Sequence, residues 1–201
     1  MSRKEDQNLI VGLDIGTSKV VAVVGEVGPD GAIEVVGFGA HPARGLKKGV
    51  VVNIESTVQS IQRAVDEAER MAGCRIHSVY TGISGSHIRG FNSHGVTAIK
   101  HHEATSEDVE RVIEAARVMA IPADQKILHI LPQEFIIDGQ EGIQEPVGMA
   151  GVRLEARVHL VTCAISAEQN IVKCVRRCGL EVDDVILQPL ASSRAVLTPD
   201  E

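Results

Sequence analysis

The sequence predicts an α/β fold, with a mixed β-sheet flanked by helices and a small α/β unit inserted into it. Of the 201 residues, 44% are hydrophobic and only 2% are aromatic, so Val, Ile, Leu and Ala must form most of the core, as in sheets covered by helices. Two β-branched runs, 10–15 and 20–24, flank a turn of small residues, which predicts two strands joined by a tight loop. Near the end, two strand–helix repeats predict parallel strands with right-handed crossovers.

The first third of the chain reads as strands followed by one helix and a further strand. Three strands are expected at 9–14, 20–27 and 33–40. The segment 44–49 has the composition of a flexible basic loop. Asn53 can cap a helix that keeps apolar residues at helical spacing as far as Met71, and Gly73 is placed to end it. A strand follows at 77–83.

From Gly85 to His159 the sequence predicts a separate α/β unit, so the first domain is discontinuous, comprising 1–84 and 160–201. Within the insert we expect a strand at 88–99, a helix at 106–120, a strand at 126–138, a glycine-rich loop and a strand from 152. Thr105 to Asp108 supply a cap and early negative charge for the helix.

The chain then returns to the first domain. The run 157–165 predicts a strand that enters a buried sheet. Ser166 and Gln169 have the spacing of a capping box, which opens a helix that Gly179 closes. A strand at 182–187 and a helix that begins at Pro189 complete the pattern.

The turn after the first strand carries the chemistry that suits a phosphate. Gly16 lets the backbone approach a ligand, Thr17 and Ser18 add hydroxyl donors, and Lys19 adds positive charge. Asp14 would repel phosphate unless a cation lay between them, and a lone carboxylate buried in an apolar strand is costly. The combination points to a magnesium nucleotide, with Asp14 facing the metal through water. The alternative is an ordinary buried hairpin with a solvated lysine, because the spacing is not that of a P-loop.

Further short motifs extend along most of the chain beyond this turn. They are Gly37-Phe38-Gly39, Ser84-Gly85-Ser86-His87-Ile88, Leu131-Pro132-Gln133-Glu134-Phe135, Glu145-Pro146-Val147-Gly148-Met149 and Leu190-Ala191-Ser192-Ser193. With Asp14-Ile15-Gly16-Thr17-Ser18-Lys19, which is similar to the first phosphate motif of the actin, Hsp70 and sugar-kinase superfamily, they resemble the FtsA family of bacterial cell-division proteins.

This resemblance implies an actin-like, ribonuclease H-like fold that binds ATP with Mg²⁺. The first domain would be subdomain 1A and the insert subdomain 1C. Gln188, between a strand and a helix of small residues, resembles the residue that orients the attacking water in the superfamily. A neutral amide is a poor general base, so hydrolysis would be slow. The alternative is that Gln188 only caps the helix that follows it.

The resemblance also implies a role in division. Members of the family polymerise, link the FtsZ ring to the cytoplasmic membrane and recruit later division proteins. The second phosphate loop, the FtsZ-docking region and the membrane helix of the family have no counterpart in this sequence. We therefore expect the chain to be the N-terminal half and inactive alone, with self-association and recruitment assigned to the insert. The full-length protein would be cytoplasmic, at the inner membrane of the septum.

Two relatives of the superfamily remain as alternatives, a metabolite kinase and a pilus-assembly ATPase. A third possibility is that the chain acts only as an interaction module through its insert. Nucleic acid is an unfavourable partner, because the formal net charge is -7 and stacking aromatics are scarce. The four cysteines suit reduced thiols, and His101-His102-Glu103 suits an exposed loop better than a metal site.

Overall fold

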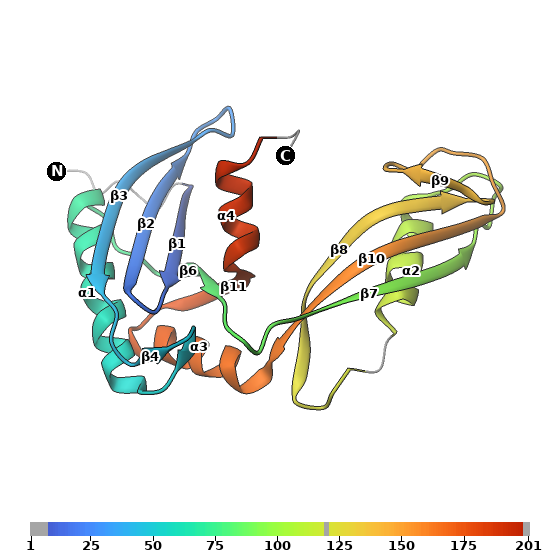
Figure 1. The fold of residues 1–201 in the computed structure, drawn as a ribbon. Helices are drawn as coiled ribbons and strands as arrows, with labels where there is room; N and C mark the ends of the chain where they lie inside the picture. Colours follow the sequence, from blue (N-terminus) through green and yellow to red (C-terminus); the bar gives the residue numbers. More distant parts are fainter. Residues whose placement is uncertain (1–7, 119–120, 199–201) are drawn as a thin grey trace. The chain divides into compact units, whose positions relative to one another are not determined.

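The computed structural model describes residues 8–118 and 121–198, which form two compact units (Figure 1). The first unit contains the chain as far as His87 and again from Ile165, and the second contains 88–164. The sequence predicts a return to the first domain at residue 160, whereas the last strand of the second unit continues to Ala164.

A five-stranded mixed sheet forms the centre of the first unit. Its strands are β1 (Leu9–Ile15), β2 (Lys19–Val27), β3 (Ile33–Pro42), β6 (Ser78–Ile83) and β11 (Glu181–Leu187). The spatial order is β11-β6-β1-β2-β3. Neighbours from β1 to β3 run antiparallel, whereas β6 is parallel to both β1 and β11. The predicted hairpin and the predicted parallel strands therefore belong to one sheet.

Helix α1 (Ile54–Ala72) covers one face of this sheet and packs against β3 and β2. Asn53 caps it by accepting a hydrogen bond from the Ser56 N–H at 2.9 Å, and Gly73 ends it in the left-handed conformation, both as predicted. The fully buried residues of the helix and of β1 and β2 form the core of this layer: Leu13, Ile15, Val20, Ala22, Val24, Ile61, Ala64 and Ala68.

Two further helices, α3 (Ile165–Arg177) and α4 (Gln188–Val196), complete the unit. The expected capping box at Ser166 is wrong. Strand β10 ends at Ala164 and α3 begins at the next residue, so Ser166 lies in the first helical turn rather than at the N-cap position. The basic segment 44–49 is also more ordered than expected, because β4 (Leu46–Lys47) pairs with β5 (Val50–Val51).

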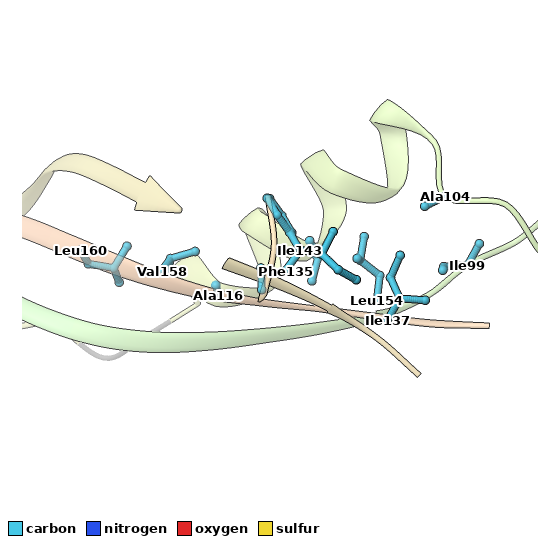
Figure 2. Close-up of a cluster of buried hydrophobic side chains, with 11 residues drawn as sticks. Ile99, Ala104, Ala116, Phe135, Ile137, Ile143, Leu154, Val158 and Leu160 are labelled. Carbon is cyan, nitrogen blue, oxygen red and sulfur yellow. The ribbon is translucent and has the colours of Figure 1, made fainter. Parts of the chain in front are cut away.

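The second unit is an antiparallel sheet covered by one helix. The sheet order is β7-β10-β8-β9, formed by β7 (Arg89–Ala98), β8 (Gln125–Ile137), β9 (Gln140–Ile143) and β10 (Arg153–Ala164). Helix α2 (Ser106–Arg117) ends earlier than expected; the predicted end at residue 120 lies outside the described residues. Figure 2 shows the buried side chains between the sheet and α2, among them Phe135, Ile137, Leu154, Val158 and Leu160.

The N-terminus of α2 forms the predicted cap. The Thr105 hydroxyl accepts a hydrogen bond from the Asp108 N–H, and the Asp108 carboxylate accepts one from the Thr105 N–H at 2.9 Å. The Thr105 hydroxyl also donates to the Asp108 carboxylate at 2.7 Å, and this bond, together with the one from the Thr105 N–H, holds the pKa of the Asp108 carboxyl below its ordinary value.

Strand β9 lies in a segment for which the sequence predicts a glycine-rich loop. Asp138 and Gly139 both have positive φ, 50° and 89°, and they join Ile137 directly to Gln140. Two residues of this kind form the two-residue hairpin turn that an Asp-Gly pair favours. The Asp138 carboxylate also accepts hydrogen bonds from the backbone N–H groups of Val152 and Arg153, which ties the hairpin to β10.

In the described part of the chain, Cys74, Cys163, Cys174 and Cys178 are present as thiols. Burial raises the pKa of the Cys178 thiol to about 11, so it is protonated at neutral pH. Among the described residues, no helix combines the length and apolar character needed to cross a membrane.

The contact between α1 and β3 depends on two glycines of β3. A Cβ atom added at Gly39 would lie 2.0 Å from the Ala64 carbonyl oxygen, and one at Gly37 would lie 2.7 Å from that of Ala68. Both obstacles are helix backbone, which cannot move aside without displacing the helix.

Substitution Gly39→Ala should therefore destabilise the protein by about 1–3 kcal/mol, the usual cost of overpacking a filled core. The measurement is the urea midpoint of unfolding. Gly12→Ala is the matched control, because a Cβ there meets no atom within 4 Å and alanine in a strand is no worse than glycine. Equal midpoints for the two variants would contradict the packing described.

Candidate functional site

Asp14 lies near the end of β1, on the sheet face opposite to the α1 core. Along β1 the residues Val11, Leu13 and Ile15 are buried, whereas Gly12 and Asp14 are exposed. The concern that Asp14 is a lone carboxylate buried in a strand is therefore not borne out, since strand alternation turns it away from the core. The open face places the carboxylate where a ligand can reach it.

The turn after β1 is held by backbone contacts on both sides. The Gly16 N–H donates to the Lys19 carbonyl at 3.0 Å, and a Cβ at Gly16 would lie 2.9 Å from that same oxygen. The Thr17 hydroxyl accepts a hydrogen bond from the Gly49 N–H at 3.0 Å, and the Ser18 carbonyl accepts one from the Ala43 N–H at 3.0 Å. Two hydrogen bonds from the segment that follows β3 therefore stabilise the turn.

These contacts leave donors at the tip of the turn. Across residues 8–118 and 121–198, no hydrogen bond occupies the backbone N–H of Thr17 or of Ser18. Both residues are exposed, and so is Lys19. The Thr17 hydroxyl, which accepts from Gly49, can still donate its own proton. Free N–H groups on a tight turn beside a lysine are the elements of an anion-binding site.

Gln188, which is 174 positions from Asp14 in the sequence, contacts it in the folded protein. It is the first residue of α4, directly after β11. Its side-chain Nε2 donates to Asp14 Oδ1 at 2.6 Å and also lies 3.4 Å from the Ile15 carbonyl oxygen. The amide is therefore directed at β1 and does not cap the helix that follows, which was the alternative interpretation of this residue. Strand β6, which lies between β1 and β11, sets the spacing that makes this contact possible.

A cavity of about 530 Å³ opens beside this pair. Its polar lining includes Asp14 and Gln188, together with Thr81 of β6 and Ser192 of α4. The remaining lining is mainly apolar and comes from β1, β2, β6, β11 and α4: Gly12, Leu13, Val21, Val23, Tyr80, Gly82, Ile186, Ala191 and Ala195. Tyr80 and Gly82 were not identified from the sequence, since neither belongs to a recognisable motif.

The surroundings make ionisation of Asp14 less favourable. Partial burial by the surrounding residues raises the pKa of the Asp14 carboxyl, and the positive charge of Lys19 offsets part of this effect. A carboxylate in such a position gains from a cation. No group of three or more His, Cys, Asp or Glu side chains that could hold a metal occurs among the described residues. One accessible carboxylate can orient Mg²⁺ through a bound water molecule, because this ion usually keeps several waters in protein sites.

Comparison with known proteins relates both units to one family. The model of the SHS2 domain inserted in FtsA matches residues 85–162. Cell division protein FtsA of Pseudomonas aeruginosa is 67% identical over 201 residues, covering 100% of this chain and 48% of that protein. The chain belongs to the FtsA family. The FtsA proteins of Neisseria meningitidis serogroup B and Escherichia coli K12 are 54% and 51% identical, covering 98% and 100% of this chain and 48% of each relative.

The chain thus spans about half the length of the FtsA proteins it matches. Among solved structures, the PilM-PilN type IV pilus biogenesis complex aligns with a TM-score of 0.64 and 19% identity, over 92% of this chain and 49% of that one. At this identity the likeness shows the fold alone. The predicted fold class, an actin-like α/β mixed sheet with flanking helices and a small inserted unit, is confirmed.

The raised pKa of Asp14 predicts how the protein responds to loss of this charge. Because the folded-state pKa lies above the unfolded value of about 3.9, ionisation of Asp14 costs stability at neutral pH, and this cost disappears as pH falls below that value. Asp14→Asn, which can still accept a hydrogen bond from Gln188, should raise the urea midpoint at pH 7.

The same comparison at about pH 3.5 should show little difference between the two proteins, because the wild-type carboxyl is then largely neutral. Lower stability of the variant at pH 7 would show that Asp14 is not strained by its surroundings.

Proposed function

We propose that the first unit forms one wall of a magnesium–ATP site in an actin-like cell-division protein. The contact between Asp14 and Gln188 carries this proposal, since it joins the residues expected at the metal and at the attacking water within one hydrogen bond. Nothing in a solvated hairpin would require an amide from a distant helix to meet an exposed carboxylate.

Each residue of the site has a role that its position allows. The N–H groups of Thr17 and Ser18 and the charge of Lys19 face phosphate oxygens, with Gly16 keeping the turn tight. Asp14 would hold Mg²⁺ through a water molecule, and the ion would supply positive charge to neutralise the phosphates. Gln188 holds the attacking water. Because its amide is not a general base, hydrolysis would be slow.

The whole protein, of which this chain matches about half in its relatives, is proposed to act in division as FtsA. It would link the FtsZ ring to the cytoplasmic face of the inner membrane, through regions outside the segment described, and would polymerise. The first unit would then be subdomain 1A, and the second subdomain 1C, which contributes to self-association and to recruitment of later division proteins. The pilus alternative is less favoured, since the FtsA proteins reach 67% identity while the pilus complex shares 19%.

The proposed phosphate contacts of the turn at 16–19 can be tested with fragments of the nucleotide. Magnesium tripolyphosphate and magnesium–ATP should shift the backbone amide resonances of Thr17 to Lys19 in ¹⁵N-labelled protein, whereas adenosine alone should not. Lys19→Ala should weaken tripolyphosphate binding about three- to tenfold, as expected from loss of an exposed ion pair worth ~1 kcal/mol.

Lys173→Ala is the matched control, because Lys173 is an exposed lysine on α3 that does not line this cavity. Shifts caused equally by adenosine, or confined to residues away from the turn, would contradict the proposal.

A further inference from the structure

Gly82 occupies a position in β6 where space, rather than backbone conformation, requires glycine. Its φ is not in the left-handed region, so any residue could adopt its backbone. A Cβ atom at this position would however lie 2.6 Å from Gln188 Cγ and 3.2 Å from Gln188 Nε2. The Gln188 side chain therefore lies across the Cα of Gly82 on its way to Asp14.

The sheet register explains why these three residues meet. Gly12 pairs with Tyr80 and Leu13 with Thr81. Because β1 and β6 are parallel, the next residues along the two strands, Asp14 and Gly82, are also neighbours. On the other side of β6, Gly82 pairs with Ile186 and Ile83 with Leu187, the residue before Gln188. A side chain that starts at Gln188 and ends at Asp14 has to cross β6, and it crosses at Gly82.

We propose that Gly82 is a positioning residue, which admits the Gln188 side chain across β6 and so holds its amide against the Asp14 carboxylate. An ionised carboxylate only accepts hydrogen bonds, so Asp14 must be met by the NH₂ group of Gln188. The Oε1 atom then points away from Asp14 and is available to accept a hydrogen bond from water. The contact fixes the orientation of the amide, and Gly82 makes the contact possible.

The catalytic consequence of this positioning rests on the proposed function, whereas the positioning itself does not. If the first unit binds magnesium–ATP, Gly82 sets the orientation in which Gln188 presents Oε1 to the attacking water, and it couples that residue to the carboxylate at the metal. The positioning itself is a property of the protein without nucleotide, so it can be measured separately.

The side-chain amide resonances of Gln188 report the contact directly. In the wild-type protein they should shift with pH as Asp14 ionises, with a midpoint above the ordinary carboxyl pKa, because the Asp14 pKa is raised. Lys19 is the charged neighbour that acts on Asp14 and should move this midpoint when replaced. Asp14→Asn should abolish the pH-dependent shift.

Gly82→Ala should also abolish it, because the methyl group displaces the Gln188 side chain, whereas Gly12→Ala on the neighbouring strand should leave it intact. Gln188 resonances in Gly82→Ala that follow pH as in the wild type would overturn the inference. The proposed function fails by a different result, namely no response of the wild-type turn to magnesium tripolyphosphate.

A second measurement covers the case in which Gly82→Ala folds poorly. If the methyl group clashes with Gln188, the loss in urea midpoint caused by Gly82→Ala should fall by about half or more when Gln188→Ala is also present. Additive effects of the two substitutions would show that Gly82 does not act through Gln188.

Discussion

The hydrogen bond between Gln188 Nε2 and Asp14 Oδ1 closes the first unit on itself, because it joins the first strand to the last helix. Its two residues are 174 positions apart in the sequence. A hydrogen bond to a charged group contributes about 1.5–3 kcal/mol, which is small against the core that surrounds it. Its importance lies in geometry, since the bond forms only if β11, β6 and β1 lie side by side in parallel register.

The two faces of the sheet have separate tasks. One face is closed by α1, and the glycines Gly37 and Gly39 bring the helix so near that its carbonyl groups almost touch β3. This rigid layer fixes β1 and β2, and hence the turn between them. The other face carries Asp14, Gln188 and the cavity, and its polar groups remain accessible. The packed core under α1 lies on the first face. The second face carries a carboxylate, Asp14, whose ionisation is less favourable than in water.

Local signals were sufficient for most of the fold. The β-branched runs of β1 and β2, the caps Asn53 and Thr105 and the glycine at the end of α1 each depend on neighbouring residues, so the sequence displays them. The errors arose where a signal had two interpretations. Ser166 satisfies the capping pattern, yet β10 runs directly into α3 and leaves it no N-cap position. Asp138-Gly139 forms a hairpin turn, but its glycine also fits the glycine-rich loop that the sequence predicts.

The site was predictable only where a motif marks it. Asp14 and the turn 16–19 stand together in the sequence, and resemblance alone singled out Gln188. Gly82 carries no such mark, because its role depends on a side chain that arrives from 106 positions later in the chain (188 minus 82) and on a register that no local pattern specifies. Contacts of this kind require the assembled sheet.

The central claim is that Asp14 faces a divalent cation at the phosphate turn. The most direct test is anomalous diffraction from crystals of the protein grown with Mn²⁺ and ATP, Mn²⁺ replacing Mg²⁺. The account predicts a manganese peak one water molecule away from the Asp14 carboxylate, with phosphate oxygens between the metal and the turn at 16–19. A manganese peak elsewhere, with triphosphate bound away from β1, would contradict it.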